Sequence, residues 1–294
     1  MRPACRMTEL LLSLSRLAPR FDAVICDVWG VIHNGKTPYF KAAEALKEFR
    51  DTHGPVLLLS NAPRPADDVA RHLAGMGVPK DAFDMILTSG DATVSELAKR
   101  AESAALKIFH IGPERDHGLF KHAAISLTRA EEANLCVCSG LFDDENETPE
   151  DYRDPLALLK AHDIEMICAN PDHKVERGEK LIFCAGAIAH AYEQIGGKVL
   201  WLGKPHAPVY QRALAMLAAK AGHALAPARV LAIGDALATD ITGANRMGLG
   251  ALLITGGIHA EQFGGHALEP DAATVARALA EHGLRVDGMM PRLV

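Results

Sequence analysis

The sequence predicts an α/β protein whose main domain is a doubly wound parallel sheet, with a smaller α/β domain inserted into it. Short apolar runs of strand length alternate with longer segments of helical periodicity, as in a parallel sheet covered by helices on both faces. This rhythm changes between about residues 103 and 196 and then resumes, and the 294 residues are about twice the usual domain size. We therefore expect one domain from residues 1–102 plus 197–294, and an inserted domain from residues 103–196.

The first block alternates strands and helices. Residues 23–26 form a short apolar run that ends at Asp27, which is typical of a buried strand. Residues 41–50 repeat apolar side chains at helical spacing. Ahead of this block, Glu9 and Arg16 interrupt the apolar start of the chain, so we expect an amphipathic helix there rather than a signal peptide. The same criteria predict strands at 55–59 and 85–88, and helices at 64–76 and 91–101.

The inserted block, residues 103–196, differs from the first block in its pattern of apolar and polar residues. Residues 143–154 are acidic and polar, as in a loop, and strand-like runs occur nearby. Residues 198–254 then return to the first rhythm, and a final helix follows. The strands expected in these two blocks are 106–111, 135–139, 165–169, 198–202, 230–233 and 251–254, and the helices are 208–221, 239–247 and 271–282.

Composition excludes several classes of protein. The chain is 49% hydrophobic and 23% charged, which is ordinary for a globular protein and excludes a disordered one. The net charge of −6 argues against a nucleic-acid partner, which needs a basic face. No run of 18 apolar residues is present, so we expect no membrane association.

The six cysteines do not form a disulfide framework. Several lie inside apolar runs, where a thiol behaves as a small hydrophobic side chain. Cys136 and Cys138 have one residue between them and would face the same side of a strand, but no second pair at zinc spacing accompanies them. Buried thiols are the favoured interpretation, and they indicate a reducing cytoplasm.

Reactive side chains follow the predicted strands. Asp27, Ser60-Asn61 and Asp235 each come at a strand end, Lys204 follows another strand, and Asp240 lies five residues after Asp235. Ligands of an open parallel sheet bind beyond the carboxyl ends of its strands. Three carboxylates at one edge repel each other unless a cation binds them, and hard oxygen ligands favour Mg²⁺.

This set of residues suits phosphoryl transfer. A carboxylate attacks a phosphate dianion only when a metal ion and an ammonium group offset the charge repulsion. A serine hydroxyl and backbone N–H groups can hold the remaining phosphate oxygens. Asp27 would then be the nucleophile, and water would hydrolyse the resulting aspartyl-phosphate.

The motifs together resemble the haloacid dehalogenase (HAD) superfamily of phosphohydrolases, and the long insert resembles the cap of its subclass IIA. The resemblance covers about residues 22–265. Subclass IIA includes nitrophenylphosphatase-like enzymes and phosphatases of sugars, nucleotides, phosphoglycolate and pyridoxal phosphate. The resemblance implies a Rossmann-like HAD core and an α/β cap. It rests on Asp27-Val28-Trp29-Gly30-Val31, Ser60-Asn61, Thr88-Ser89-Gly90-Asp91, Ala169-Asn170-Pro171-Asp172, Gly203-Lys204-Pro205, Gly234-Asp235-x4-Asp240 and Thr242-Gly243-Ala244-Asn245.

The resemblance also implies roles for single residues. Asp27 is the expected nucleophile and a metal ligand, together with Asp235, Asp240 and the backbone carbonyl of Trp29. Lys204 is expected to neutralise Asp27 and the transferring group. Ser60 and the backbone of Asn61 are the expected phosphate contacts. Asp172, in the cap, is a candidate substrate contact.

Trp29 departs from the family pattern. Phosphatases of the superfamily usually carry a second aspartate at this position, which protonates the leaving group and then activates water. An indole does neither, and general acid–base help contributes about 10²–10⁴-fold to the rate. His33 and His206 are the local candidates for a replacement acid, although each could equally be an ordinary loop histidine. Trp29 could instead pack over a ring-bearing substrate.

The leading hypothesis is a cytoplasmic, Mg²⁺-dependent phosphomonoesterase that acts on a small phosphate ester through an aspartyl-phosphate. Sugar phosphates and a vitamin B6 5′-phosphate are the substrate classes considered, and a homodimer through the cap is an open expectation. The alternative is a ligand-binding protein or a phosphotransferase on a HAD scaffold, with weak hydrolysis because Trp29 replaces the usual acid.

Overall fold

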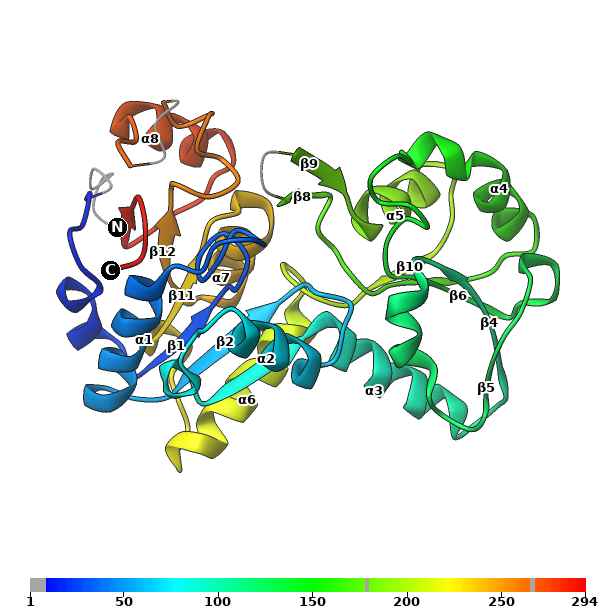
Figure 1. The fold of residues 1–294 in the computed structure, drawn as a ribbon, viewed down its shortest axis with the longest axis horizontal. Coiled ribbons are helices and arrows are strands. Elements are labelled where there is room, and N and C mark those ends of the chain that lie inside the picture. Colours follow the sequence, from blue (N-terminus) through cyan, green and yellow to red (C-terminus); the bar gives the residue numbers. More distant parts are fainter. Residues whose placement is uncertain (1–8, 178–179, 265–267) are drawn as a thin grey trace. The chain divides into compact units, whose positions relative to one another are not determined.

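The computed structural model describes residues 9–177, 180–264 and 268–294. The chain forms two compact units, one from residues 1–60, 71–87 and 210–294 and the other from residues 61–70 and 88–209. Each unit is built around its own parallel sheet, and Figure 1 labels the elements of both. No helix in the described part of the chain is long and apolar enough to cross a membrane.

The first unit contains a six-stranded sheet with the order β13-β12-β11-β1-β2-β3. The chain runs outward from β1 to β2 and β3 on one side, and from β11 to β12 and β13 on the other. The topological switch point therefore lies between β1 and β11, which pair in parallel. The strands are β1 (Ala23–Cys26), β2 (Val56–Ser60), β3 (Met85–Thr88), β11 (Val230–Gly234), β12 (Gly250–Ile254) and β13 (Gly288–Met290).

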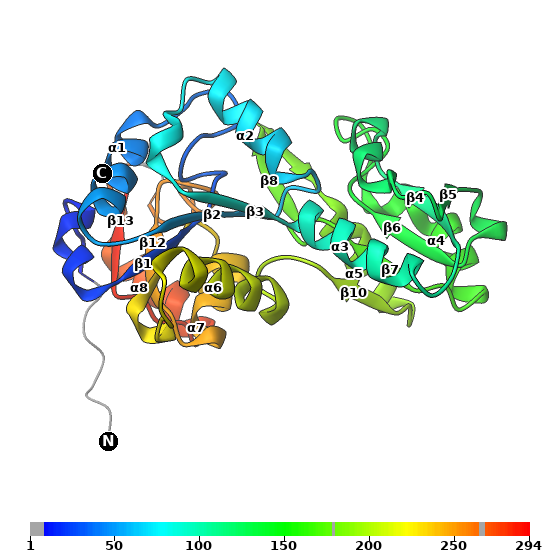
Figure 2. The same cartoon turned by 90° about the horizontal axis from the view of Figure 1, so that it is seen from below.

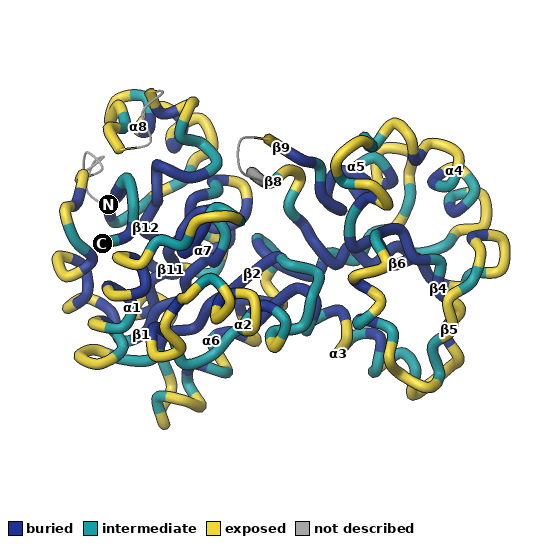
Figure 3. The backbone as a smooth tube through the Cα atoms, in the orientation of Figure 1, coloured by how far each residue is buried: buried dark blue, intermediate teal, exposed yellow. Residues whose placement is uncertain are grey.

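Helices cover both faces of this sheet. α1 (Phe40–Thr52) lies on one face, and α6 (Ala207–Ala221) and α7 (Thr242–Met247) lie on the other (Figure 2). Strands β1, β2 and β11 are buried along their whole length because both faces are covered (Figure 3). The remaining helices near this sheet are α2 (Ala66–Gly75) and α8 (Ala272–Glu281).

The second unit contains a five-stranded parallel sheet with the order β10-β7-β6-β4-β5. Side chains of β6 alternate between two cores: Cys136 and Cys138 pack with α4 and α5, and Leu135 and Val137 pack with Leu97 of α3. The two thiols thus share one face, as predicted. The elements are α3 (Ser89–Ala101), β4 (Leu106–Ile111), β5 (Ile125–Leu127), β6 (Leu135–Cys138), α4 (Arg153–Ala161), β7 (Met166–Cys168), α5 (Ala185–Gln194) and β10 (Val199–Trp201), with an antiparallel hairpin of β8 (Lys174–Arg177) and β9 (Lys180–Phe183).

The predicted fold class is confirmed, and most of the expected elements form within a few residues of their expected ends. Two expectations were wrong. The strand expected at 198–202 forms as β10 but joins the five-stranded sheet, since an apolar run does not specify which sheet a strand will join. An amphipathic helix was expected near the start of the chain; residues 1–8 lie outside the described residues, and the described residues after them form two 3₁₀ turns, Leu14–Arg16 and Ala18–Arg20. Pro19 in the second turn disfavours a continuous helix.

Candidate active site

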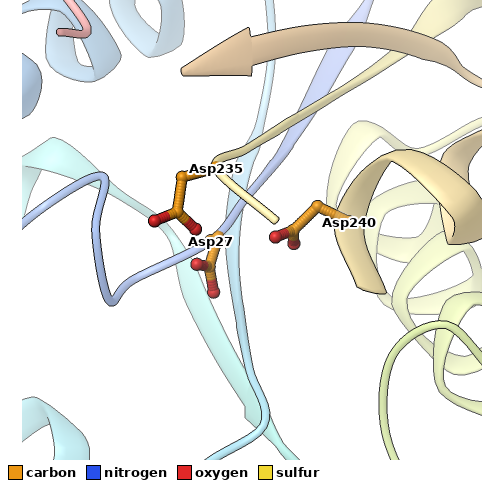
Figure 4. Close-up of side chains that lie close together, drawn as sticks. All are labelled: Asp27, Asp235 and Asp240. Carbon is orange, nitrogen blue, oxygen red and sulfur yellow. The ribbon is translucent and has the colours of Figure 1, made fainter. Parts of the chain in front are cut away.

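Three buried aspartates gather at the switch point of the six-stranded sheet. Asp27 follows β1 and Asp235 follows β11, so the parallel register brings both to the same edge. Asp240 comes from the single π-helical turn η8 (Leu237–Ile241) just before α7, and such turns are frequent at functional sites. Carboxylate oxygens of the three residues lie within 4.8 Å of one another, and the side chains converge on one point (Figure 4).

Glycines and backbone N–H groups hold these acids in place. A Cβ at Gly30, where φ is +83°, would lie 2.0 Å from Asp235 Oδ2, and a Cβ at Gly234 would lie 2.1 Å from Asp240 Cγ. Only glycine lets the backbone approach the carboxylates this closely. The N–H of Ile258 donates to Asp235 Oδ2 at 2.8 Å, and the N–H of Ala236 donates to Asp240 Oδ2 at 3.2 Å. These contacts orient the side chains toward a shared centre.

The three carboxylates fit a divalent cation. Asp27, Asp235 and Asp240 are 8%, 5% and 4% exposed, so water screens their mutual repulsion poorly. An all-oxygen set of this kind matches hard cations such as Mg²⁺. Within the described residues, no other group of three or more acidic, histidine or cysteine side chains has the geometry to hold a metal ion.

Ser60 is the last residue of β2, which pairs with β1. Since Cys26 is in register with Leu58, Ser60 lies at the same carboxyl edge as Asp27, one residue further along the neighbouring strand. Ser60 is 8% exposed. Its position agrees with the strand-end placement expected from the sequence.

In the second unit, the side chain of Asn61 joins three predicted site segments. Its Nδ2 donates to Asp172 Oδ1 at 2.8 Å and to the carbonyl oxygen of Lys204 at 3.2 Å. Its Oδ1 accepts from the N–H of Lys204 at 2.8 Å and from Ser89 Oγ at 3.3 Å. The side chain of Asn61 thus fixes the loop that carries Lys204. The sequence had indicated a role only for the Asn61 backbone, and it gave no separate signal for Ser89.

The segment Thr88-Ser89-Gly90-Asp91 also has a structural explanation. Thr88 and Asp91 form a capping box at the start of α3, and Asp91 Oδ1 accepts from the N–H of Ala66 at 3.1 Å. A Cβ at Gly90 would lie 2.5 Å from the backbone of Arg64. The segment therefore holds the chain that follows Asn61 against α3.

Trp29 lies half-buried in the loop after β1. The edge of its ring meets the ring of His33, with centroids 5.0 Å apart and planes at 68°. A Cβ at Gly35 would lie 2.6 Å from the indole, so the backbone there packs directly on the ring. Trp29 is thus held from two sides within its own loop.

His33 does not suit the role of replacement acid. It is only 2% exposed, and its Nδ1 accepts from the N–H of Gly35 at 2.8 Å. Burial, together with the nearby His72, lowers the pKa of His33 to about 4. The imidazole is therefore neutral near pH 7 and a poor proton donor. The alternative of a surface-loop histidine was also wrong, because the ring is buried against Trp29.

His206 belongs to the second unit. Its ring stacks on Trp201 with centroids 5.6 Å apart and planes at 11°, and its N–H donates to the carbonyl of Gly203 at 2.9 Å. These contacts hold the ring and the backbone of His206, which follows Lys204 by two residues. Its role as a proton donor stays a prediction.

The chain is similar to known hydrolases along nearly its whole length. It matches the family described as haloacid dehalogenase-like hydrolase over residues 24–126 and the HAD-hydrolase-like family over residues 201–282. A crystal structure of a haloacid dehalogenase-like hydrolase from Brucella suis is 41% identical; the match covers 97% of this chain and 100% of that one, with a TM-score of 0.85. This chain belongs to the haloacid dehalogenase-like hydrolase family.

Two curated relatives are phosphatases. Ribonucleotide monophosphatase NagD of Escherichia coli is 27% identical over 241 residues, which cover 80% of this chain and 88% of NagD. D-glycerol 3-phosphate phosphatase of Mycobacterium tuberculosis is 26% identical over 250 residues, which cover 84% of this chain and 66% of the relative. The predicted family is thereby confirmed, as is the predicted enzyme class, a hydrolase of phosphate monoesters. The NagD similarity agrees with the subclass IIA resemblance.

Proposed function

We propose that this enzyme is a Mg²⁺-dependent phosphomonoesterase that acts on a small phosphorylated metabolite through an aspartyl-phosphate. The observation that carries the proposal is the convergence of Asp27, Asp235 and Asp240 at the switch point of the six-stranded sheet. These carboxylates and the backbone carbonyl of Trp29 would hold the ion. A bound Mg²⁺ supplies positive charge that offsets the repulsion between a carboxylate and a phosphate dianion.

Asp27 is the proposed nucleophile. One of its carboxylate oxygens forms a bond to phosphorus while the bond from phosphorus to the leaving-group oxygen breaks. A water molecule then attacks the phosphorus of the aspartyl-phosphate, releasing inorganic phosphate and restoring the Asp27 carboxylate. In this proposal, Ser60 and the backbone N–H of Asn61 bind phosphate oxygens, and the Lys204 ammonium offsets the charge of the transferring group. The Asn61 side chain positions Lys204 through the hydrogen bonds described above.

The leaving group is the least constrained part of the substrate. An indole has no acidic proton to give, so the leaving alkoxide takes its proton from solvent unless His206 supplies it. Trp29 then acts as a flat apolar surface for the leaving group. The named relatives hydrolyse a ribonucleotide and a glycerol phosphate, and a sugar phosphate or a vitamin B6 5′-phosphate is the substrate class we favour.

Residues 103–196 are the proposed cap, with Asp172 as its contact to substrate. We place the enzyme in a reducing cytoplasm, because the described cysteines, which are Cys26, Cys136, Cys138, Cys168 and Cys184, are all buried thiols. Burial raises the pKa of the Cys138 and Cys168 thiols well above the usual value, so these groups stay unreactive. A homodimer through the cap belongs to the same proposal.

A second candidate function follows from Trp29. Without the usual acid, the protein would bind phosphate esters or pass the phosphoryl group to an acceptor other than water. The complete set of nucleophile, lysine and metal acids argues for hydrolysis, because a binding protein has little use for a nucleophile.

The test is phosphate release in the presence of Mg²⁺ from a panel of sugar phosphates, nucleoside monophosphates, phosphoglycolate, vitamin B6 5′-phosphates and p-nitrophenyl phosphate. The controls are the Asp27→Asn variant and removal of Mg²⁺. We expect turnover of one metabolite class that both controls abolish. Absence of turnover in a folded, Mg²⁺-binding protein would contradict the proposal and favour the binding function.

A further inference from the structure

The carboxylate of Asp172 contacts the side chain of Asn61 within the second unit of the chain. Asn61 Nδ2 donates to Asp172 Oδ1 at 2.8 Å. The same amide pairs with both backbone groups of Lys204, since its Nδ2 donates to the carbonyl oxygen at 3.2 Å and its Oδ1 accepts from the N–H at 2.8 Å. Asn61 and Lys204 are each 3% exposed, and Asp172 is half-buried. One side chain therefore connects Asp172 to the backbone of Lys204.

The Asn61 amide has a single orientation that suits these neighbours. An amide has a donor end and an acceptor end, and a half-turn about its last side-chain bond exchanges them. The N–H of Lys204 can only donate and so requires the oxygen end, whereas an ionised carboxylate can only accept and so requires the nitrogen end. A hydrogen bond to an ionised group is about twice as strong as one between neutral groups, so Asp172 supplies the strongest constraint on this orientation.

The loop before Lys204 packs directly on the oriented amide. Gly203 has a φ of +144°, and a Cβ on it would lie 2.6 Å from Asn61 Oδ1 and 2.2 Å from Ser89 Oγ. Ser89 is fully buried, and its hydroxyl donates to Asn61 Oδ1 at 3.3 Å. Because the packing leaves no room for a side chain at position 203, a rotation of the amide would displace the backbone that carries Lys204.

The backbone of Asp172 is anchored to α5. Its carbonyl oxygen accepts from the N–H of Gly186 at 3.1 Å, and its own N–H donates to Asn170 Oδ1 at 3.1 Å. A Cβ at Gly186 would lie 2.6 Å from the carbonyl oxygen of Asp172, so the turn packs against the first turn of the helix. The following turn of α5 places Ile188 and Ala189 in a buried core of the five-stranded sheet. The hydrophobic core of this unit thus supports the carboxylate.

We propose that Asp172 is a positioning residue for Lys204, whose carboxylate holds the Asn61 amide in the orientation that fixes the Lys204 backbone. This inference rests on the proposed role of Lys204 in charge compensation. It gives Asp172 a function that needs no contact with substrate. Since the Lys204 ammonium would act on the phosphoryl group that all substrates share, loss of Asp172 should lower kcat by the same factor for every phosphate ester. A contact between Asp172 and the leaving group would instead give losses that differ among esters.

The first test is a double-mutant cycle on kcat, with glycerol 3-phosphate and p-nitrophenyl phosphate as substrates. Asp172→Ala should lower kcat about tenfold on both esters in the otherwise wild-type enzyme. In the Lys204→Met background it should lower kcat less than about twofold, because no ammonium group remains to be positioned. Asp172→Asn, which keeps an acceptor oxygen, should lose less than Asp172→Ala. Asp154→Ala, at an exposed aspartate of the same unit, is the matched control and should lose nothing.

Three outcomes of the cycle would overturn the inference. The first is an equal effect of Asp172→Ala with and without Lys204, which would show that Asp172 acts independently of the lysine. The second is a loss confined to one of the two esters, which would indicate a contact with the leaving group. The third is an unchanged kcat in Asp172→Ala.

A measurement without turnover separates this inference from the proposed function. Hydrogen exchange of the Lys204 amide, followed by NMR in the absence of substrate, reports on the hydrogen bond from this N–H to Asn61 Oδ1. We expect exchange about tenfold faster or more in Asp172→Ala than in the wild type or Asp154→Ala. Faster exchange in a protein that hydrolyses neither ester would support the positioning by Asp172 and contradict the proposed function. Equal exchange in all three proteins would refute the role of Asp172, whatever the esters show about hydrolysis.

Discussion

The carboxyl edges of the two parallel sheets carry different chemistry at equivalent places. At the switch point of the six-stranded sheet, three aspartates place their oxygens within 4.8 Å of one another. At the switch point of the five-stranded sheet, the polar groups are His110, Ser139 and Asp116, and burial shifts the pKa values of the histidine and the aspartate toward the uncharged forms. The first edge gathers three carboxylates, whereas the second carries one carboxyl group, one hydroxyl group and one imidazole.

The two edges are therefore suited to different ligands. Carboxylates this close together are stable when a cation lies between them, which suits phosphoryl transfer. The hydroxyl of Ser139 and the neutral imidazole of His110 can both donate and accept, so the second edge offers hydrogen bonds in place of converging carboxylates. Substitutions of Asp27 or Asp235 at the first edge should therefore affect every phosphate ester in the same proportion.

The largest effect is expected for Asp27→Asn. Loss of a nucleophile typically costs about 10⁴-fold or more in kcat, and here the loss should be the same for all phosphate esters. Steady-state phosphate release measures it, with the exposed Asp51→Asn as the matched control. If Asp27→Asn kept more than about a tenth of the activity, the nucleophile would have to be another residue.

Asp235→Asn and Lys204→Met separate metal binding from charge compensation. Both variants should lose about 10²–10³-fold in kcat, since each removes a group that offsets charge in the transition state. Mg²⁺ at a concentration of a hundred times its Kd should stabilise the folded wild-type protein by about 2.7 kcal/mol and so raise its melting temperature. Of the two variants, only Asp235→Asn should lose this rise. Thermal unfolding with and without Mg²⁺ tests this. If Lys204→Met also lost the rise in melting temperature, the separate roles of Asp235 in metal binding and Lys204 in charge compensation would be contradicted.

Trp29→Asp introduces the carboxyl group that the resemblance to the family leads us to expect at this position. We expect a gain of about tenfold or more on alkyl phosphates and little change on aryl phosphates, because only poor leaving groups need a proton donor. Trp29→Phe is the control and should gain nothing. A loss on every substrate would show instead that the indole belongs to the binding site.

The smallest expected effect is on the stability of the protein and concerns His33, whose ring packs against Trp29. The pKa of His33 is lowered from 6.5 to about 4 in the folded protein, so the unfolded chain binds more protons between these two pH values. Stability should therefore fall as pH decreases from 6.5 to 4, with a contribution from His33 of about 1.4 kcal/mol per pH unit. The free energy of unfolding, measured with urea between pH 7 and pH 5, should depend less on pH in His33→Asn than in the wild type or in the control variant His53→Asn. The same pH dependence of the free energy of unfolding in all three proteins would contradict the buried, neutral state of His33.

The sequence was informative about residues at strand ends. Asp27 and Asp235 could be predicted together because parallel strands bring their carboxyl ends to one edge, and Asp240 was predicted from its spacing of five residues after Asp235. The π-helical turn around Asp240 was missed, since the helical spacing expected over residues 239–247 does not distinguish a π-helical turn from an α-helix. α5 was missed as well, because its alanine-rich face is buried on several sides and shows little periodicity.

The grouping of His110, Ser139 and Asp116 shows what the sequence alone could not predict. His110 is inside a strand, Asp116 is in a short turn, and Ser139 is 23 residues further on, so no local pattern connects them. Burial alone makes them notable, and burial depends on how β4 and β6 pair. The domain boundaries and the roles of single residues stay predictions, which the variants above test.

The measurement that tests the central claim most directly is chemical trapping of the aspartyl-phosphate. The enzyme is mixed with p-nitrophenyl phosphate and Mg²⁺, quenched, reduced with borohydride and digested for mass spectrometry. Because Trp29 provides no base to activate water, the intermediate should accumulate, and reduction should convert residue 27 alone to homoserine. Steady turnover with an unmodified Asp27, or modification at a different residue, would contradict the account.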